Sequence, residues 1–208
     1  MNDENKIKEK INKEDLVIYL DECAAGVLCF DLFVCGVVMD KDSINSISGI
    51  NDSKKLSETK RSQLFPLIIK AAKDYEVVRI NPEEVDRLNI FQARMEGFRR
   101  AINILSKRTE AKYAIIDGNK KPDNILIDTD FLVKGDLLIP GISCASIIAK
   151  HSHTLEIYKL SKEEPYSKYG LEKHKGYGTK LHMEALKKYG PIKGFHRFSY
   201  KPVKENIK

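Results

Sequence analysis

The chain has 208 residues, of which 42% are hydrophobic and 32% are charged. This length suffices for one substantial hydrophobic core, whereas two full domains would each be small. The formal net charge of +6 favours an acidic partner such as nucleic acid. Because no apolar run follows the charged N-terminus and no later stretch is long enough to span a bilayer, we expect a cytoplasmic protein without membrane segments.

The first elements in chain order are a polar segment and a pair of strands. Residues 1–14 are rich in Asn, Glu, Asp and Lys, which predicts a flexible tail or a frayed helix. Residues 16–20 are β-branched, aromatic and aliphatic, typical of a buried strand, and they end in Asp21-Glu22. Residues 32–39 predict a second strand that pairs with the first as a hairpin or around a bulge.

A helix is predicted to follow Ser57, which can act as its N-cap. Pro66 lies within its apolar pattern, so we expect a kink or two shorter helices. The next segments predict a strand at residues 76–80, a helix start at 81–84 and a longer amphipathic helix at 90–105.

Two further buried strands are predicted before Asp117 and Asp136, at residues 113–116 and 131–133. Helices are expected from Ser143 onward and over residues 180–189. No cysteine belongs to a CxxC pair, so we interpret all of them as reduced and mostly buried: Cys23, Cys29, Cys35 and Cys144.

Strand ends therefore present four carboxylates, on Asp21, Glu22, Asp117 and Asp136. Hard divalent cations prefer oxygen ligands, and two such ions about 4 Å apart can activate a water and stabilise the leaving oxygen of a phosphodiester. Acidic residues after strands are more often helix caps or turn formers, however. The spacing alone leaves both interpretations open.

Eight ordered segments distinguish between these interpretations, because together they resemble the ribonuclease HII family from about Leu16 to Val203. The segments are YLDE at 19–22, NDSKKLS at 51–57, NPEEVDRLNIFQA at 81–93, IIDGN at 115–119, KGD at 134–136, ISCASIIAK at 142–150, HKGYGT at 174–179 and HRFS at 196–199. Agreement of eight segments in order is far more specific than agreement of one.

The resemblance implies an α/β fold with a ribonuclease-H-like mixed sheet flanked by helices and a small helical C-terminal appendage. We accordingly expect a flexible N-terminal tail at 1–14, a catalytic domain at 15–160 and a helical substrate-clamping region at 161–208. The implied activity is endonucleolytic cleavage of RNA in RNA–DNA hybrids, and incision of DNA duplexes that contain ribonucleotides, by two-metal hydrolysis with Mg²⁺ or Mn²⁺. The protein is expected to be a monomer. By matched position, the implied metal ligands and catalytic residues are Asp21, Glu22, Asp117 and Asp136.

The resemblance also implies substrate contacts at Cys23, Ala24, Ala25, Gly26, Ser53, Lys54 and Tyr177. Without the resemblance, we would interpret Ser53 and Lys54 as part of a solvated loop, and Tyr177 as a ring packed over the C-terminal helix. Histidines 151 and 153 are interpreted as surface or capping residues. The arginines of the long helix, Arg94, Arg99 and Arg100, are interpreted as a solvated face.

The chain departs from the family pattern directly after the Asp-Glu pair. Where the family usually has Gly-Arg-Gly, this chain has Ala24-Ala25-Gly26, which restricts positive φ at Ala24 and removes a charged group at Ala25. Phe30-Asp31 replaces the usual Gly-Pro, and the segment from His151 to Thr154 replaces a pattern containing Arg-Asp. We therefore expect weakened discrimination for a single ribonucleotide.

Two competing functions follow from the same residues. The altered loop could leave a protein that binds hybrids with impaired cleavage, although the acidic residues are intact. A nuclease directed at DNA on the same fold is the other alternative. Residues 201–208 contain no convincing aromatic motif for binding a replication clamp.

Overall fold

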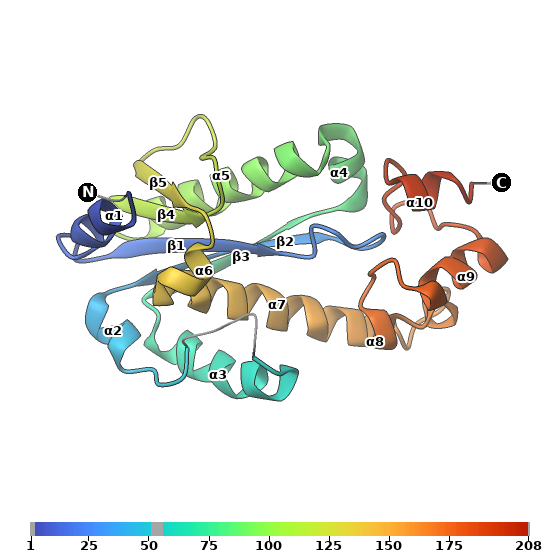
Figure 1. Ribbon diagram of the computed structural model, residues 1–208, viewed down its shortest axis with the longest axis horizontal. Coiled ribbons are helices and arrows are strands. Elements are labelled where there is room, and N and C mark those ends of the chain that lie inside the picture. The colour runs from blue at the N-terminus through green and yellow to red at the C-terminus, as the bar shows by residue number, and fades with distance from the viewer. Residues whose placement is uncertain (1–2, 51–55, 208) are drawn as a thin grey trace.

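A computed structural model describes residues 3–50 and 56–207 and contains a five-stranded mixed sheet in the order β3-β2-β1-β4-β5 (Figure 1). β1 pairs with β2, and β2 with β3, in antiparallel fashion, whereas β1 with β4 and β4 with β5 are parallel. The strands are β1 Val17–Cys23, β2 Leu32–Met39, β3 Asp74–Ile80, β4 Tyr113–Asp117 and β5 Asp128–Leu132. The expected mixed sheet is confirmed.

Helices cover both faces of this sheet, as Figure 1 shows. On one face lie α2 Lys41–Asn45, α3 Glu58–Ala71 and α7 Pro140–Leu160, and on the other lie α4 Pro82–Leu88 and α5 Ile90–Arg108. The C-terminal region gathers at one end of the molecule with a 3-10 helix Ser167–Tyr169, α8 Leu171–His174, α9 Lys180–Tyr189 and α10 Lys201–Lys204. The remaining helices are α1 Asp3–Ile11 and α6 Gly135–Leu138. Within the described ranges, no helix has the length and apolarity needed to cross a bilayer.

The alternation of side chains along β1 and β4 divides the core into two layers. Tyr19 and Ile115 pack in one cluster with residues of α7, whereas Leu20 and Ile116 pack in another with residues of α5. Successive side chains of a strand point to opposite faces. Every residue that continues β1 is thereby assigned to the α7 layer or to the α5 layer.

The sequence left alternatives open at two elements. Of the flexible tail or frayed helix expected for residues 1–14, the structure has a helix, α1 over Asp3–Ile11, because Ile7 is buried in the α7-side core and Lys10 forms ion pairs with Asp128 and Asp130. Of the kink or two shorter helices expected at Pro66, the second alternative is excluded. α3 continues through Pro66, and Leu64 and Ile68 on either side of it are buried.

The C-terminal region is joined to the loop that follows β1 by a buried arginine. The guanidinium of Arg197 donates hydrogen bonds to the carbonyl oxygens of Ala25, at 2.9 Å, and Phe30, at 3.0 and 3.1 Å. Backbone N–H groups of Leu28 and Phe30 donate to the carbonyls of Gly176 and Phe195. Since Arg197 is completely buried, its charge depends on these carbonyls for compensation.

Three histidines form the polar centre of the same region. The rings of His174 and His182 stack with centroids 4.4 Å apart, and His182 Nε2 lies 3.4 Å from His196 Nε2. Burial lowers the pKa of His182 to about 4 and that of His196 to about 3. The charge of His174 lowers the pKa of His182 further, and that of His182 lowers the pKa of His196. The folded region therefore holds these rings neutral.

This histidine cluster predicts acid-sensitive stability. The unfolded chain takes up protons below about pH 6.5 while folded His182 and His196 resist them, so the stability present above pH 6.5 is lost as the pH falls toward 4. NMR titration should show no protonation of either ring between pH 8 and 5, and urea unfolding should show falling stability over that interval. A titration midpoint near 6.5 for either ring would contradict the prediction.

Candidate active site

Three carboxylates converge at the end of the parallel pair β1 and β4. Oxygen atoms of Asp21, Asp117 and Asp136 all lie within 4.8 Å of one another, and Asp21 and Asp136 are buried. Asp21 and Asp117 come together because both continue the α7-facing positions of adjacent strands. Asp136 differs from its predicted place at a strand end, since it lies in the first turn of α6.

The turn before α6 couples Asp136 to Asp117. The backbone N–H of Gly135 donates to Asp117 Oδ1 at 2.6 Å, and Lys134 precedes it in the left-handed conformation with φ 59°. A Cβ at position 135 would lie 2.6 Å from Ile142 Cδ1. The Ile142 side chain would have to shift to admit a larger residue there, and the KGD segment brings the third carboxylate to the other two.

Glu22 lies apart from this group of three. Because it follows Asp21 in β1, its side chain points toward α5, where Glu22 Oε1 pairs with Arg94 Nη2 at 2.8 Å. The expectation that Arg94 belongs to a solvated face was wrong, since its side chain is largely buried against Glu22. Asp21 instead faces Ser146 and Lys150, which favour its charged form.

Burial dominates the electrostatics of both adjacent acids. It raises the pKa of Asp21 well above its ordinary value, and the neighbouring charges of Glu22 and Asp117 raise it further. Burial also raises the pKa of Glu22, against the opposing effect of Arg94. Buried carboxylates this close together repel one another unless a cation compensates them.

The donor set fits a hard divalent cation. Asp21, Asp117 and Asp136 offer only carboxylate oxygens, the ligands that Mg²⁺ and Mn²⁺ prefer. Glu22 Oε2 is buried and makes no hydrogen bond within the described part of the chain, so it has capacity for a further ligand contact.

A basic cleft of about 220 Å³ opens beside the carboxylates. It is lined by Cys23, Arg61, Lys150, His153, Thr154, Lys175 and Tyr177. Sequence reasoning assigned no role to Arg61 or Lys150. Lys150 ends the ISCASIIAK segment, and that position was the available signal; Arg61 lies on α3 and could be placed here only by the packing of α3 on α7.

The residues after Glu22 form the other wall of the site. Ala24 adopts a left-handed conformation with φ 69° although it is not glycine, and it is buried. The carbonyl of Ala25 accepts hydrogen bonds from Arg197 and from the Tyr200 hydroxyl. A Cβ at Gly26 would lie 3.9 Å from Tyr177 Cε1.

Of the other residues predicted to contact substrate, Tyr177 and Cys23 lie within the described part of the chain. Tyr177 is half-exposed at the mouth of the cleft, and Cys23 lies partly buried at the end of β1. Ser53 and Lys54 lie outside the described residues.

The other residues that differ from the family pattern make contacts with neighbouring side chains. Phe30 also has a positive φ, 72°, and the Asp31 carboxylate accepts from Arg79 Nε at 2.7 Å. His153 was predicted to be a surface or capping residue, but it is buried. Its ring lies edge-on to that of Phe33, with the ring centroids 5.4 Å apart. The ring of His151 lies tilted against that of Phe65, with the ring centroids 4.3 Å apart. These substitutions are packed into the fold.

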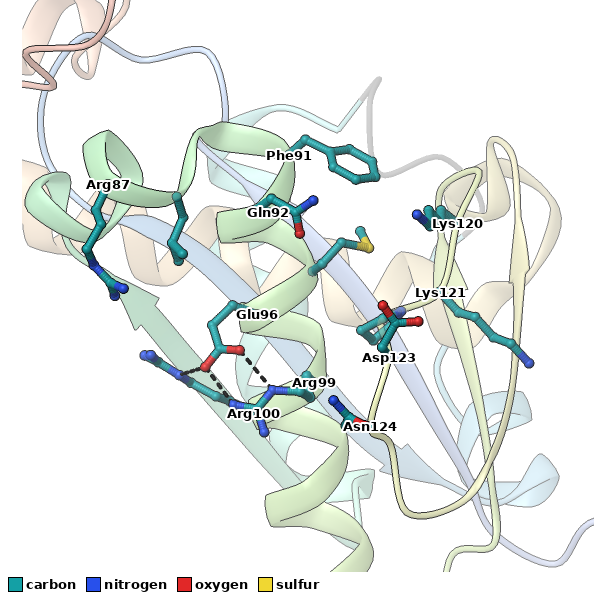
Figure 2. A pocket seen from close by; sticks show the side chains of 13 residues that line it. Arg87, Phe91, Gln92, Glu96, Arg99, Arg100, Lys120, Lys121, Asp123 and Asn124 are labelled. Carbon is teal, nitrogen blue, oxygen red and sulfur yellow. Dashed lines mark hydrogen bonds and ion pairs between the residues drawn. The ribbon is translucent and has the colours of Figure 1, made fainter.

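A larger pocket of about 400 Å³ lies along α5, opposite residues 120–124 (Figure 2). Its basic residues include Arg99 and Arg100, both of which pair with Glu96 in the figure. None of the clustered carboxylates lines it. The smaller cleft is also not lined by them, but it includes Cys23, which follows Glu22 in β1, and Lys150, whose charge acts on Asp21. The smaller cleft is therefore the better candidate.

The buried side chains of Cys29, His182 and His196 lie close enough together to hold a metal ion, but their protonation does not suit metal binding. His196 Nδ1 accepts from the Ile192 N–H at 2.9 Å, which places the proton of the neutral ring on Nε2, the atom that faces His182. Burial raises the pKa of the Cys29 thiol, which disfavours the thiolate. We interpret this group as structural.

A mixed sheet whose strand ends gather three carboxylates beside a basic cleft defines a metal-dependent nuclease of ribonuclease-H-like fold. The profile named Ribonuclease HII matches residues 18–203. Proteins named Ribonuclease HII are 45% identical over 192 residues in Vibrio parahaemolyticus, covering 92% of this chain and 87% of the relative, and 43% identical over 188 residues in Francisella tularensis subsp. mediasiatica, covering 90% and 96%. The chain belongs to the ribonuclease HII family of metal-dependent endoribonucleases.

Solved structures agree in fold. The ribonuclease H2 from Pyrococcus horikoshii OT3 has a TM-score of 0.77 at 24% identity, covering 92% of this chain and 96% of that one. Bst-RNase HIII in complex with Mn²⁺ has a TM-score of 0.72 at 19% identity, covering 92% of this chain and 68% of that one. At these identities the likeness concerns the fold alone.

The first prediction from this geometry concerns Asp136. Asp136→Asn should weaken Mn²⁺ binding at least roughly tenfold by calorimetry, because a charged oxygen ligand is lost, while the melting temperature without metal stays unchanged or rises as repulsion is relieved. Asp123→Asn changes the same charge on an exposed loop and is the control. Native affinity in Asp136→Asn would disprove its assignment as a ligand.

The second prediction concerns the left-handed Ala24. Ala24→Gly should stabilise the protein by about 1 kcal/mol in urea unfolding, because glycine adopts positive φ without the steric cost that alanine has. Ala25→Gly is the matched control, since the neighbouring residue has no positive φ and glycine there should lower stability. Equal effects of the two substitutions would contradict the interpretation.

Proposed function

We propose that this protein cleaves the RNA strand of RNA–DNA hybrids by two-metal phosphodiester hydrolysis, with Asp21, Glu22, Asp117 and Asp136 as metal ligands. The observation that supports this most is the convergence of Asp21, Asp117 and Asp136 within 4.8 Å beside a basic cleft. Membership of the ribonuclease HII family supports the hybrid as substrate.

Divalent cations at such carboxylates supply the chemistry of activating a water and stabilising the leaving oxygen. Mg²⁺ and Mn²⁺ both suit an all-oxygen donor set. The structurally similar Bst-RNase HIII forms a complex with Mn²⁺, and we propose that either ion serves this chain.

The chain's own groups orient the substrate. Arg61, Lys150 and Lys175 surround the cleft between Cys23 and Tyr177, where they can attract and position backbone phosphates. The half-exposed ring of Tyr177 can stack on a sugar or base beside the cleaved bond. By resemblance, Ser53 and Lys54 are proposed to contact phosphate as well.

The loop of Cys23, Ala24, Ala25 and Gly26 is proposed to approach the ribose. Arg197 and Tyr200 fix this loop through the carbonyl of Ala25, which makes residues 161–208 a support for substrate recognition in addition to a clamp. DNA-embedded ribonucleotides are proposed as a second substrate. Because Ala24-Ala25 replaces Gly-Arg, discrimination for a single ribonucleotide should be weaker than cleavage of a continuous hybrid.

No observation favours a binding protein without cleavage, since the acidic residues are present and three of them converge. A monomeric state and a cytoplasmic location stay predictions.

Cleavage mapping on three duplexes tests this function. With Mn²⁺ or Mg²⁺, a continuous hybrid should be cut, a duplex with one embedded ribonucleotide should be cut on the order of tenfold more slowly, and an all-DNA duplex should stay intact. The double substitution Ala24→Gly, Ala25→Arg should speed single-ribonucleotide incision selectively. Equal cutting of all-DNA would favour a DNA-directed nuclease, and efficient single-ribonucleotide incision by the native chain would refute the weakened discrimination.

A further inference from the structure

The ion pair between Glu22 and Arg94 separates the proposed metal ligands into two groups. Asp21, Asp117 and Asp136 face one another, whereas Glu22 is held on the α5 side by Arg94 Nη2 at 2.8 Å. Arg94 lies in the second turn of α5, and α5 packs on β1 and β2. Arg94 therefore projects from a helix packed on the sheet, and its side chain is largely buried.

The partners of this pair are incompletely satisfied within the described part of the chain. Glu22 Oε2 and Arg94 Nε are both buried and make no hydrogen bond there. A Cβ at Gly118, the residue after Asp117, would lie 3.8 Å from Arg94 Nη2. The guanidinium thus lies close both to Glu22 and to the backbone that follows Asp117, and its charge acts on Glu22.

Such a guanidinium has two opposing effects. It compensates the negative charge of buried Glu22, which would otherwise be costly. It also repels an incoming divalent cation and occupies Oε1, so that only Oε2 of Glu22 is available to a cation while the ion pair is closed. Glu22 can offer both carboxylate oxygens to a cation beside the other three acids only if the ion pair opens.

We propose that Arg94 is a positioning residue that holds Glu22 out of the carboxylate cluster and releases it when a second divalent cation binds. This inference rests on the proposed function, because it takes Glu22 as a metal ligand. The first ion is held by the three clustered aspartates. The second ion competes with Arg94 and therefore binds more weakly than the first.

Calorimetric titration with Mn²⁺ in the absence of nucleic acid tests the proposal. Arg94→Gln should bind the second, weaker ion at least roughly tenfold more tightly than the native chain, because a competing charge is removed. Lys107→Gln removes the same charge from an exposed position at the far end of α5 and should change the affinity less than twofold, since about 20 Å of helix separates the two positions. Unchanged or weaker binding by Arg94→Gln would overturn the proposal.

A double-mutant cycle establishes whether Arg94 acts through Glu22. In a Glu22→Gln background, Arg94→Gln should give little or no further tightening, whereas an undiminished gain would refute the role of the pair. Arg94→Lys should return the affinity toward the native value. If Arg94→Gln alone fails to fold, Arg94→Lys takes its place in the titration: the ammonium holds Glu22 less firmly than the guanidinium, so the second ion should bind more tightly than to the native chain, and unchanged or weaker binding would overturn the proposal.

Thermal unfolding gives an independent readout. Without metal, Arg94→Gln should melt below the native chain because Glu22 loses its partner, and added Mn²⁺ should raise its melting temperature more than it raises the native one. An equal metal-induced rise in both proteins would contradict release of Glu22. Failure of hybrid cleavage would reject the proposed function but leave these metal-binding results separately interpretable.

Discussion

The organisation of the site depends on the alternation of side chains along β1. Asp21 and Glu22 are adjacent in sequence, so the strand sends one acid toward α7 and the other toward α5. Asp21 thereby meets Asp117 and Asp136, and Glu22 meets Arg94. Burial and like charge raise the pKa of Asp21, and an arginine offsets part of the same effect at Glu22. The end of β1 thus contributes Asp21 to the carboxylate cluster and Glu22 to an ion pair with Arg94.

The wall of the site next to these acids depends on the opposite end of the chain. Arg197 is buried, and its donors bind the carbonyls of Ala25 and Phe30. The neutral histidines His182 and His196 pack in the same region, close to Tyr177, whose carbonyl His182 contacts at 3.1 Å. The stability of the C-terminal region and the position of the loop after β1 are therefore physically coupled, because the hydrogen bonds of Arg197 join the two.

The loop between β1 and β2 has residues other than glycine at two positions of positive φ. Ala24 and Phe30 both adopt positive φ, the conformation that glycine would adopt without strain. The guanidinium of Arg79 lies over the rings of Phe30 and Phe33, 5.2 and 5.3 Å from their centroids, and also forms an ion pair with Asp31. New side-chain packing thus accompanies the substitutions around the β1–β2 loop. The acids themselves are untouched, which separates the chemistry of the site from its choice of substrate.

The sequence by itself determined the strands, the order of the motifs and the acids at or near strand ends, because these follow from local periodicity and from the residues present. It also carried the alternation that places Asp21 and Glu22 on opposite faces. Only the tertiary structure decided what each acid meets. Arg94, Arg61 and Lys150 gained their places from helix packing, α1 from the burial of Ile7, and Asp136 from a left-handed turn before α6. Contacts between residues distant in sequence depend on how helices pack on the sheet, and no local pattern encodes that packing.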